Sequence, residues 1–61
     1  MSPQLVGILA AIASANARVA AMQAHNAQCA AEGRAPSYGS GDFFVEAQHL
    51  DVLSIEARNA Q

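Results

Sequence analysis

Hydrophobic residues in the first half of the chain recur every seven positions, in two sets three residues apart. The sets are Leu5, Ile12, Val19 and Asn26, and Ile8, Ala15, Met22 and Cys29. This is the a and d pattern of a helix that packs along a seam against another helix. Asn26 occupies an a position, where one polar residue often fixes register and oligomeric state.

The residue types at either end place this first helix at about residues 3–32. Ser2 is the predicted N-cap, and Pro3 fits the first helical position because its missing N–H has no partner there. Gly33 suits a helix C-terminus, and Pro36 prevents continuation. Alanine, the strongest helix former, fills eleven of the twenty-two positions from 10 to 31.

A connection rich in glycine, serine and proline follows at residues 33–41, and a second helix is predicted over about 41–59. Ser40 is the predicted N-cap of this helix, with Asp42 in its first turn. One side of the helix carries Phe43, Ala47, Leu50, Leu53 and Ala57. Phe44, Val52 and Ile55 extend the apolar surface, and the predicted polar face holds Asp42, Glu46, His49 and Glu56.

These elements predict an all-α, two-helix antiparallel hairpin forming a single domain over 1–61. Counting back from Gly33 at equal rise, the second helix ends beside Ser14. The apolar residues before Ser14 would then be uncovered, at a loss of about 1.5–3 kcal/mol for each large side chain. The chain is therefore expected to form a homo-oligomeric helical bundle. The predicted oligomer interface is Leu5, Ile8, Leu9, Ile12, Val19, Met22 and Asn26.

Small residues form a further stripe on the first helix, and two readings of it stay open. The stripe is Ala10, Ala17, Ala24 and Ala31, flanked by Val6, Ala13, Ala20 and Ala27. It is either an exposed face chosen for helix propensity or a surface that another helix approaches closely. The absence of Glu and Lys on this stripe favours close approach.

Composition and charge exclude several classes of protein. Charged residues make up 13%, and three arginines against five acids give a net charge of −2, which argues against a nucleic-acid partner. A single cysteine makes no internal disulfide. The apolar run from Leu5 to Ala13 lacks the basic residues of a secretory signal, and Asn16 and Arg18 interrupt it as a membrane span. The expectation is a cytoplasmic protein without a membrane partner.

Residues with catalytic or metal-binding chemistry are few. His25 and Cys29 are spaced to share a helical face with Glu32, but this set is too small for an ordinary zinc site. A Cys–His nucleophilic pair would also need an oriented base and an oxyanion site, which two helices offer little room to build. No phosphate-binding glycine loop is present. The sequence therefore predicts no enzyme, no metal and no cofactor.

The connection is the best candidate for a ligand site. Ser40 and Gly41 begin a helix, whose free N–H groups attract anions, and Arg34 supplies a positive charge. Tyr38 offers a ring for stacking on a base. Arg34, Tyr38, Ser40 and Gly41 are thus the predicted ligand-binding residues. The simpler interpretation is that the glycines and serines only cap helices and Tyr38 covers the end of the hairpin.

Part of the chain resembles small uncharacterised helical-hairpin proteins encoded by phages and prophages. The resemblance lies in residues 17–19, 22–26 and 43–47, with Tyr38 and Leu50. It implies a binding role without turnover, as in phage accessory proteins that block a host protein or sequester a nucleotide signal of host defence. Three hypotheses follow: an oligomer that binds a small anionic ligand between subunits, a module that inhibits or bridges a host protein, and a self-assembling structural component.

Overall fold

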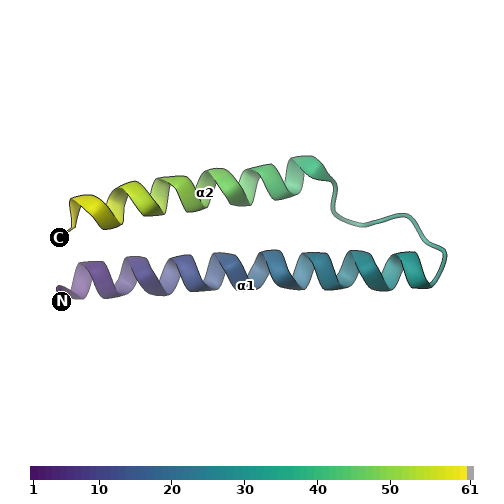
Figure 1. Ribbon diagram of the computed structural model, residues 1–61, viewed down its shortest axis with the longest axis horizontal. Helices are drawn as coiled ribbons and strands as arrows, with labels where there is room; N and C mark the ends of the chain where they lie inside the picture. Colours follow the sequence, from purple (N-terminus) through teal and green to yellow (C-terminus); the bar gives the residue numbers. More distant parts are fainter. Residues whose placement is uncertain (61) are drawn as a thin grey trace.

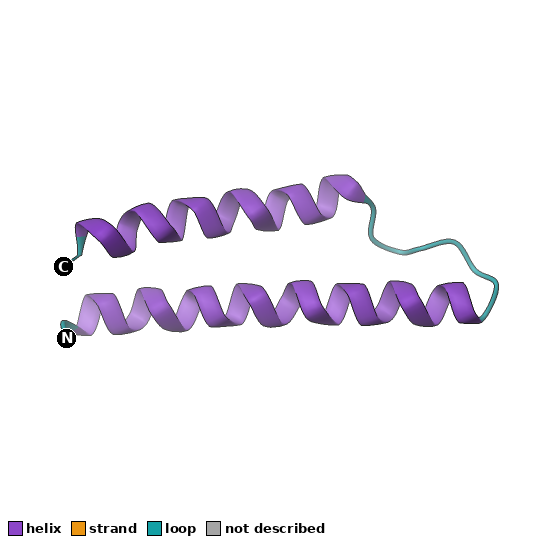
Figure 2. Cartoon of the chain, viewed as in Figure 1, coloured by secondary structure: helices purple, strands orange, loops and turns teal. Residues whose placement is uncertain are grey.

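The protein is an antiparallel hairpin of two helices, described for residues 1–60 in a computed structural model (Figure 1). Helix α1 spans Pro3–Ala31 and helix α2 spans Ser40–Asn59. The Cα atoms fill a slab of 47 × 17 × 9 Å. No strand occurs in residues 1–60 (Figure 2). The all-α hairpin predicted from the sequence is confirmed, and Gln61 of the predicted domain lies outside the described residues.

Local hydrogen bonds define both ends of α1. The Ser2 hydroxyl accepts a hydrogen bond from the Leu5 N–H at 3.1 Å, which caps the helix N-terminus. At the other end Gly33 has φ +72°, a conformation that favours glycine. The Gly33 N–H donates to the Ala30 carbonyl and the Arg34 N–H to the Cys29 carbonyl, at 3.1 and 2.8 Å. These two bonds form a Schellman motif, which ends α1 where the sequence places a glycine.

Helix α2 begins one residue earlier than the sequence predicts, because Gly39, not Ser40, is the N-cap. Ser40 is the first helical residue. The Asp42 carboxylate accepts a hydrogen bond from the Gly39 N–H at 2.9 Å, and the Asp42 N–H donates to the Gly39 carbonyl at 3.1 Å. The side chain of Asp42 thus selects Gly39 as the cap and supplies the acid that the helix dipole favours.

The connection between the helices, residues 32–39, turns back along the last turns of α1 instead of extending beyond it. The Asn26 Nδ2 donates to the Tyr38 carbonyl at 2.8 Å, and the Tyr38 N–H donates to Asn26 Oδ1 at 3.1 Å. Beside this pair, His25 Nε2 lies 2.9 Å from the Ser37 hydroxyl. Helix α2 therefore starts near the level of Asn26, well before the end of α1.

This return path overturns the expected overhang at the N-terminus. Because α2 starts before the end of α1, its 20 residues reach back to the beginning of α1, and the end of α2 lies beside the start of α1 (Figure 1). Leu5, Ile8 and Ile12 are half-buried within the hairpin rather than left without an intrachain partner. The count from Gly33 was wrong because it assumed a loop that only spans the gap between the helices.

The seam between the helices follows a heptad pattern on both sides. On α1 the buried and half-buried positions include Leu5, Ile8, Ile12, Ala15, Val19, Met22, Asn26 and Cys29, as the sequence predicts. On α2 they are Phe43, Glu46, Leu50, Leu53 and Ala57, followed by the C-cap residue Ala60. Ala47, expected on this side, is exposed, and Glu46, expected on the polar face, lies in the seam. The seam residues of α2 are spaced by three and four positions, which is a heptad pattern. Apolar residues on the rest of the helix obscure this pattern in the sequence.

Candidate functional site

The predicted ligand residues of the connection do not converge in the hairpin. The Arg34 guanidinium donates to Glu32 at 2.8 Å, and both side chains are exposed. The Tyr38 ring packs edge-on against the His25 ring, with centroids 5.7 Å apart. Within residues 1–60, no hydrogen bond joins Arg34 to Tyr38, Ser40 or Gly41.

The N-terminus of α2 is also less suited to an anion than the sequence indicates. The Asp42 carboxylate already accepts the Gly39 N–H, and its negative charge would repel a phosphate at the same place. A Cβ built on Gly39 or Gly41 would meet no atom within 4 Å, so neither glycine lines a tight cradle. No pocket is present in the described part of the chain. Anion binding by the connection stays a prediction, and one copy of the chain encloses no site for it.

A polar cluster bridges the two helices at their middle. The Arg18 Nε and Nη2 donate to the two oxygens of Glu46, each at 3.2 Å, and Nη2 lies 3.4 Å from His49 Nδ1. Arg18 also donates to Ser14 at 3.3 Å. The Glu46 side chain is 18% exposed and that of Arg18 is 45% exposed. This cluster was not predicted from the sequence, although the position of Glu46 in the α2 heptad is a signal for it.

A second cluster lies where the connection meets α1. The Ser37 hydroxyl lies between His25 Nε2, at 2.9 Å, and Cys29 Sγ, at 3.8 Å. Cys29 is fully buried, so its thiol is closed off from solvent. His25, Cys29 and Glu32 do not come together as a metal site, because no group of three potential ligands is close enough anywhere in residues 1–60. The arrangement holds the connection against α1.

The predicted interface residues divide into two groups. Leu5, Ile8, Ile12, Val19 and Met22 lie half-buried in the seam. Asn26 forms hydrogen bonds with the connection, and Leu9 is 43% exposed. Contact of these residues with a second copy stays a prediction, since their burial here comes from within one chain.

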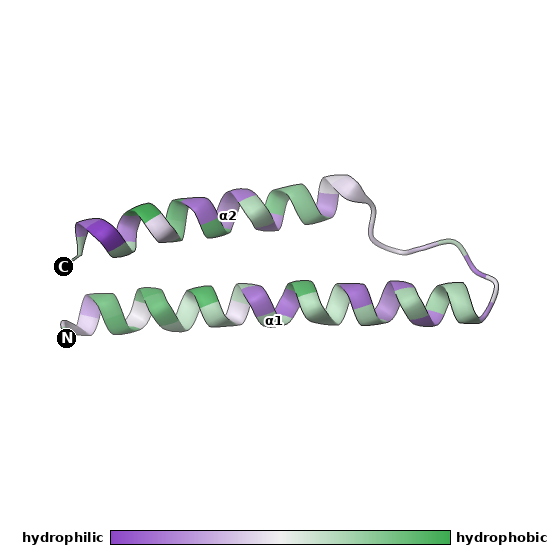
Figure 3. Cartoon of the chain, viewed as in Figure 1, coloured by the Kyte–Doolittle hydropathy of each residue, from purple (hydrophilic) through white to green (hydrophobic). Residues whose placement is uncertain are grey.

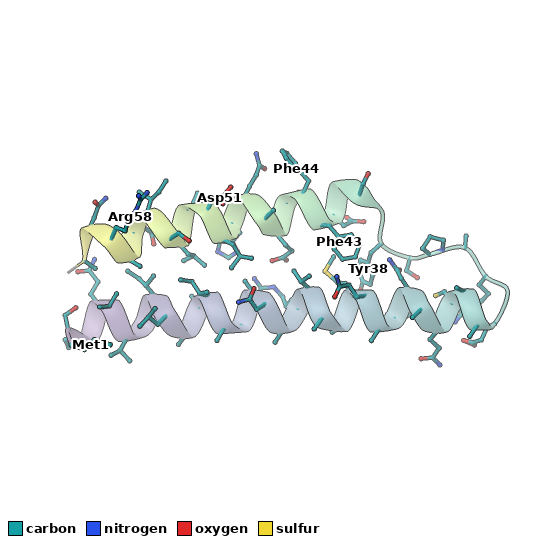
Figure 4. The ribbon with its side chains drawn as sticks, viewed as in Figure 1. Met1, Tyr38, Phe43, Phe44, Asp51 and Arg58 are labelled. Carbon is teal, nitrogen blue, oxygen red and sulfur yellow. The ribbon has the colours of Figure 1, made fainter. Side chains whose placement is uncertain are left out.

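Large apolar side chains remain exposed on both helices. They are Val6 and Leu9 of α1, and Phe44, Val45, Val52 and Ile55 of α2. Phe43 points toward α1 whereas Phe44 points away from it (Figure 4). Only Ala15, Cys29 and Leu53 are buried among the described residues. The hairpin therefore covers one side of each helix and leaves considerable apolar surface in contact with solvent.

Helix α1 is long and apolar enough, by length and composition, to cross a membrane. Asn16 and Arg18, expected from the sequence to interrupt a membrane span, therefore do not exclude one. Core helices and signal sequences share this length and composition. In the hairpin Arg18 is paired with Glu46 of α2, and a membrane span by α1 would break this pair or draw Glu46 in with it.

Comparison of the chain with protein-family models, with curated proteins and with solved structures finds no match. The resemblance to phage-encoded hairpin proteins stays a prediction.

Proposed function

We propose that the protein is a non-enzymatic helical interaction module that works as a homo-oligomer. Its role is to present helical surfaces for docking, first to other copies of itself. The observation that carries this proposal is the small number of buried residues, three in residues 1–60, beside six large apolar side chains that stay exposed on the helices. A chain of this size gains little stability from its own core.

The free energy of burying exposed apolar side chains favours assembly. Fully burying a large apolar side chain stabilises a protein by about 1.5–3 kcal/mol. Phe44 is 63% exposed and Leu9 is 43% exposed, so much of this gain is unrealised in a single copy. Contact between copies would bury part of this apolar surface and so recover part of the free energy. Charged residues, which would make such surfaces soluble, amount to only 13% of the sequence.

A second candidate function is the docking of a different protein through the outer side of α2. The exposure of Val45, Val52 and Ile55, which face away from α1, favours this function. An apolar helical stripe of this kind fits a hydrophobic groove. Ile55→Asp should abolish capture of such a partner, whereas Ser54→Asp, one residue earlier, should retain it.

Light scattering over protein concentrations from about 10 μM to 1 mM tests the proposed homo-oligomer. The expected mass is a multiple of the 6.3 kDa chain and rises with concentration toward a plateau. A mass of 6.3 kDa at every concentration would overturn the proposal.

A further inference from the structure

The two broad faces of the hairpin differ in charge. Seam positions on α1 are flanked on one side by Arg18 and His25 and on the other by Leu9, Asn16 and Gln23, each set spaced by seven residues. The Arg18–His49 contact shows that the charged flank of α1 meets the corresponding flank of α2. The broad face formed by these two flanks is here named the charged face.

The opposite broad face carries no charged flanking residue from either helix. It is formed by Leu9, Asn16 and Gln23 of α1 and by Ala47 and Ser54 of α2, and is here named the uncharged face. All five residues are exposed, and no side-chain hydrogen bond between the helices involves Leu9, Asn16 or Gln23. Figure 3 shows that apolar residues dominate the N-terminal half of α1, where Leu9 lies.

From this segregation of charge we infer that the uncharged face packs against the same face of a second copy, giving a symmetric dimer of four helices. This inference rests on the proposed homo-oligomer and names the surface that forms it. Because both copies contribute the same face, one contact covers both, as in the commonest closed oligomers. Val6 and Phe44 lie at the margins of this face and would extend the contact.

The area available for contact favours a broad face of the hairpin, and not the outer side of α2, as the dimer interface. The slab measures 47 by 17 Å, so a broad face has a projected area of about 800 Å². That matches the roughly 800 Å² per partner of a standard stable interface. The outer side of α2 is about 30 Å long and one helix, about 10 Å, wide, which gives only about 300 Å². This area is typical of weak contacts.

Charge then decides between the two broad faces. A second copy on the charged face would have to remove water from the Arg18–Glu46 pair and from His49, Asp42 and Glu56. Removing charges from water costs more than their mutual attraction returns unless the geometry is excellent. On the uncharged face the flanking side chains are neutral, and the amides of Asn16 and Gln23 can bond across the two-fold axis. The charged residues nearest to it are Asp51 and Arg58, which lie at its margin in the heptad column of Phe44 and are exposed.

Light scattering of three variants tests the inference, with circular dichroism as a check on helix content. Leu9→Glu places a charge on the uncharged face and should lower the mass from about twice 6.3 kDa to 6.3 kDa. Asn16→Glu replaces a polar, exposed residue and should dissociate the dimer without weakening the hairpin. The matched control is Val52→Glu, which adds the same charge at a residue of similar exposure on the other side of α2 and should leave the dimer intact.

Different outcomes contradict the homo-oligomer and the uncharged face. A monomeric unmodified protein overturns the homo-oligomer and with it the dimer face. An oligomer that survives both Leu9→Glu and Asn16→Glu overturns the uncharged face alone. Dissociation by Val52→Glu also overturns the face, because it places the contact on the outer side of α2.

Discussion

Replacing Asn26 by alanine should release the connection from α1 and weaken the hairpin. Asn26 makes two hydrogen bonds to the backbone of Tyr38, at 2.8 and 3.1 Å. Each such bond contributes about 0.5–1.5 kcal/mol. Tyr38 lies at an exposed position where water can replace a lost partner, so the expected loss is about 1–2 kcal/mol, in the lower part of the summed range. For a chain of this length that is a decrease in Tm of roughly 4–16 °C.

Thermal unfolding followed by circular dichroism measures this loss, at one fixed protein concentration because assembly also changes Tm. Hydrogen exchange adds a local measurement, since the Tyr38 N–H should lose protection in Asn26→Ala. Asn26→Asp keeps an acceptor for the Tyr38 N–H and loses the donor to its carbonyl, so an intermediate loss is expected. Gln28→Ala is the control, because Gln28 is exposed, lies outside the uncharged face and makes no hydrogen bond through its side chain.

The result that would refute this reasoning is an Asn26→Ala protein that is as stable as Gln28→Ala and has unchanged exchange at Tyr38. If the same variant altered the oligomeric mass instead, Asn26 would act between subunits, as its heptad position alone predicts.

Three further predictions concern Gly33, Leu53 and the Arg18–Glu46 pair. Gly33→Ala should destabilise the protein by about 1 kcal/mol in urea unfolding, because Gly33 has φ +72°, whereas Gly41→Ala, in open space within α2, should be neutral or stabilising. Leu53→Ala removes the one large aliphatic side chain buried among the described residues, and thermal unfolding should show a loss of about 2–3 kcal/mol, at the low end for such changes because the seam is narrow. A double-mutant cycle of Arg18→Ala and Glu46→Ala should give a coupling of about 0.2–1 kcal/mol that decreases with added salt; a coupling independent of salt would contradict a solvent-screened pair.

The helices and the α1 seam could be predicted from the sequence because each depends on local rules. Ser2, Pro3 and Gly33 are residue types with strong positional preferences at helix ends, and the structure uses each of them in that way. The α1 heptad is regular because, apart from Val6 and Leu9, the positions between its apolar residues are alanine, glycine or polar. Such signals need no knowledge of the partner helix.

The register of α2 could not be predicted because it depends on where the connection travels. The choice between a connection that extends beyond α1 and one that returns along it is made by Asn26 and by the His25–Ser37 contact, both between residues twelve apart. Glu46 was misplaced for a related reason: its role in the seam depends on Arg18, 28 residues away. Sequence periodicity describes one helix at a time and contains no such pairing.

The contacts that fix this register also decide which surface remains for assembly. A slip of α2 by one heptad would keep apolar residues in the seam, so hydrophobic packing alone discriminates weakly between registers. Such a slip would separate Arg18 from Glu46 and Asn26 from Tyr38, and it would move Ala47 about 10 Å along the face that Leu9 shares. The Arg18–Glu46 ion pair adds little to stability, and the two Asn26 hydrogen bonds add about 1–2 kcal/mol. Their effect is to select one register, and a defined register is what a self-complementary face requires if two copies are to meet in one arrangement.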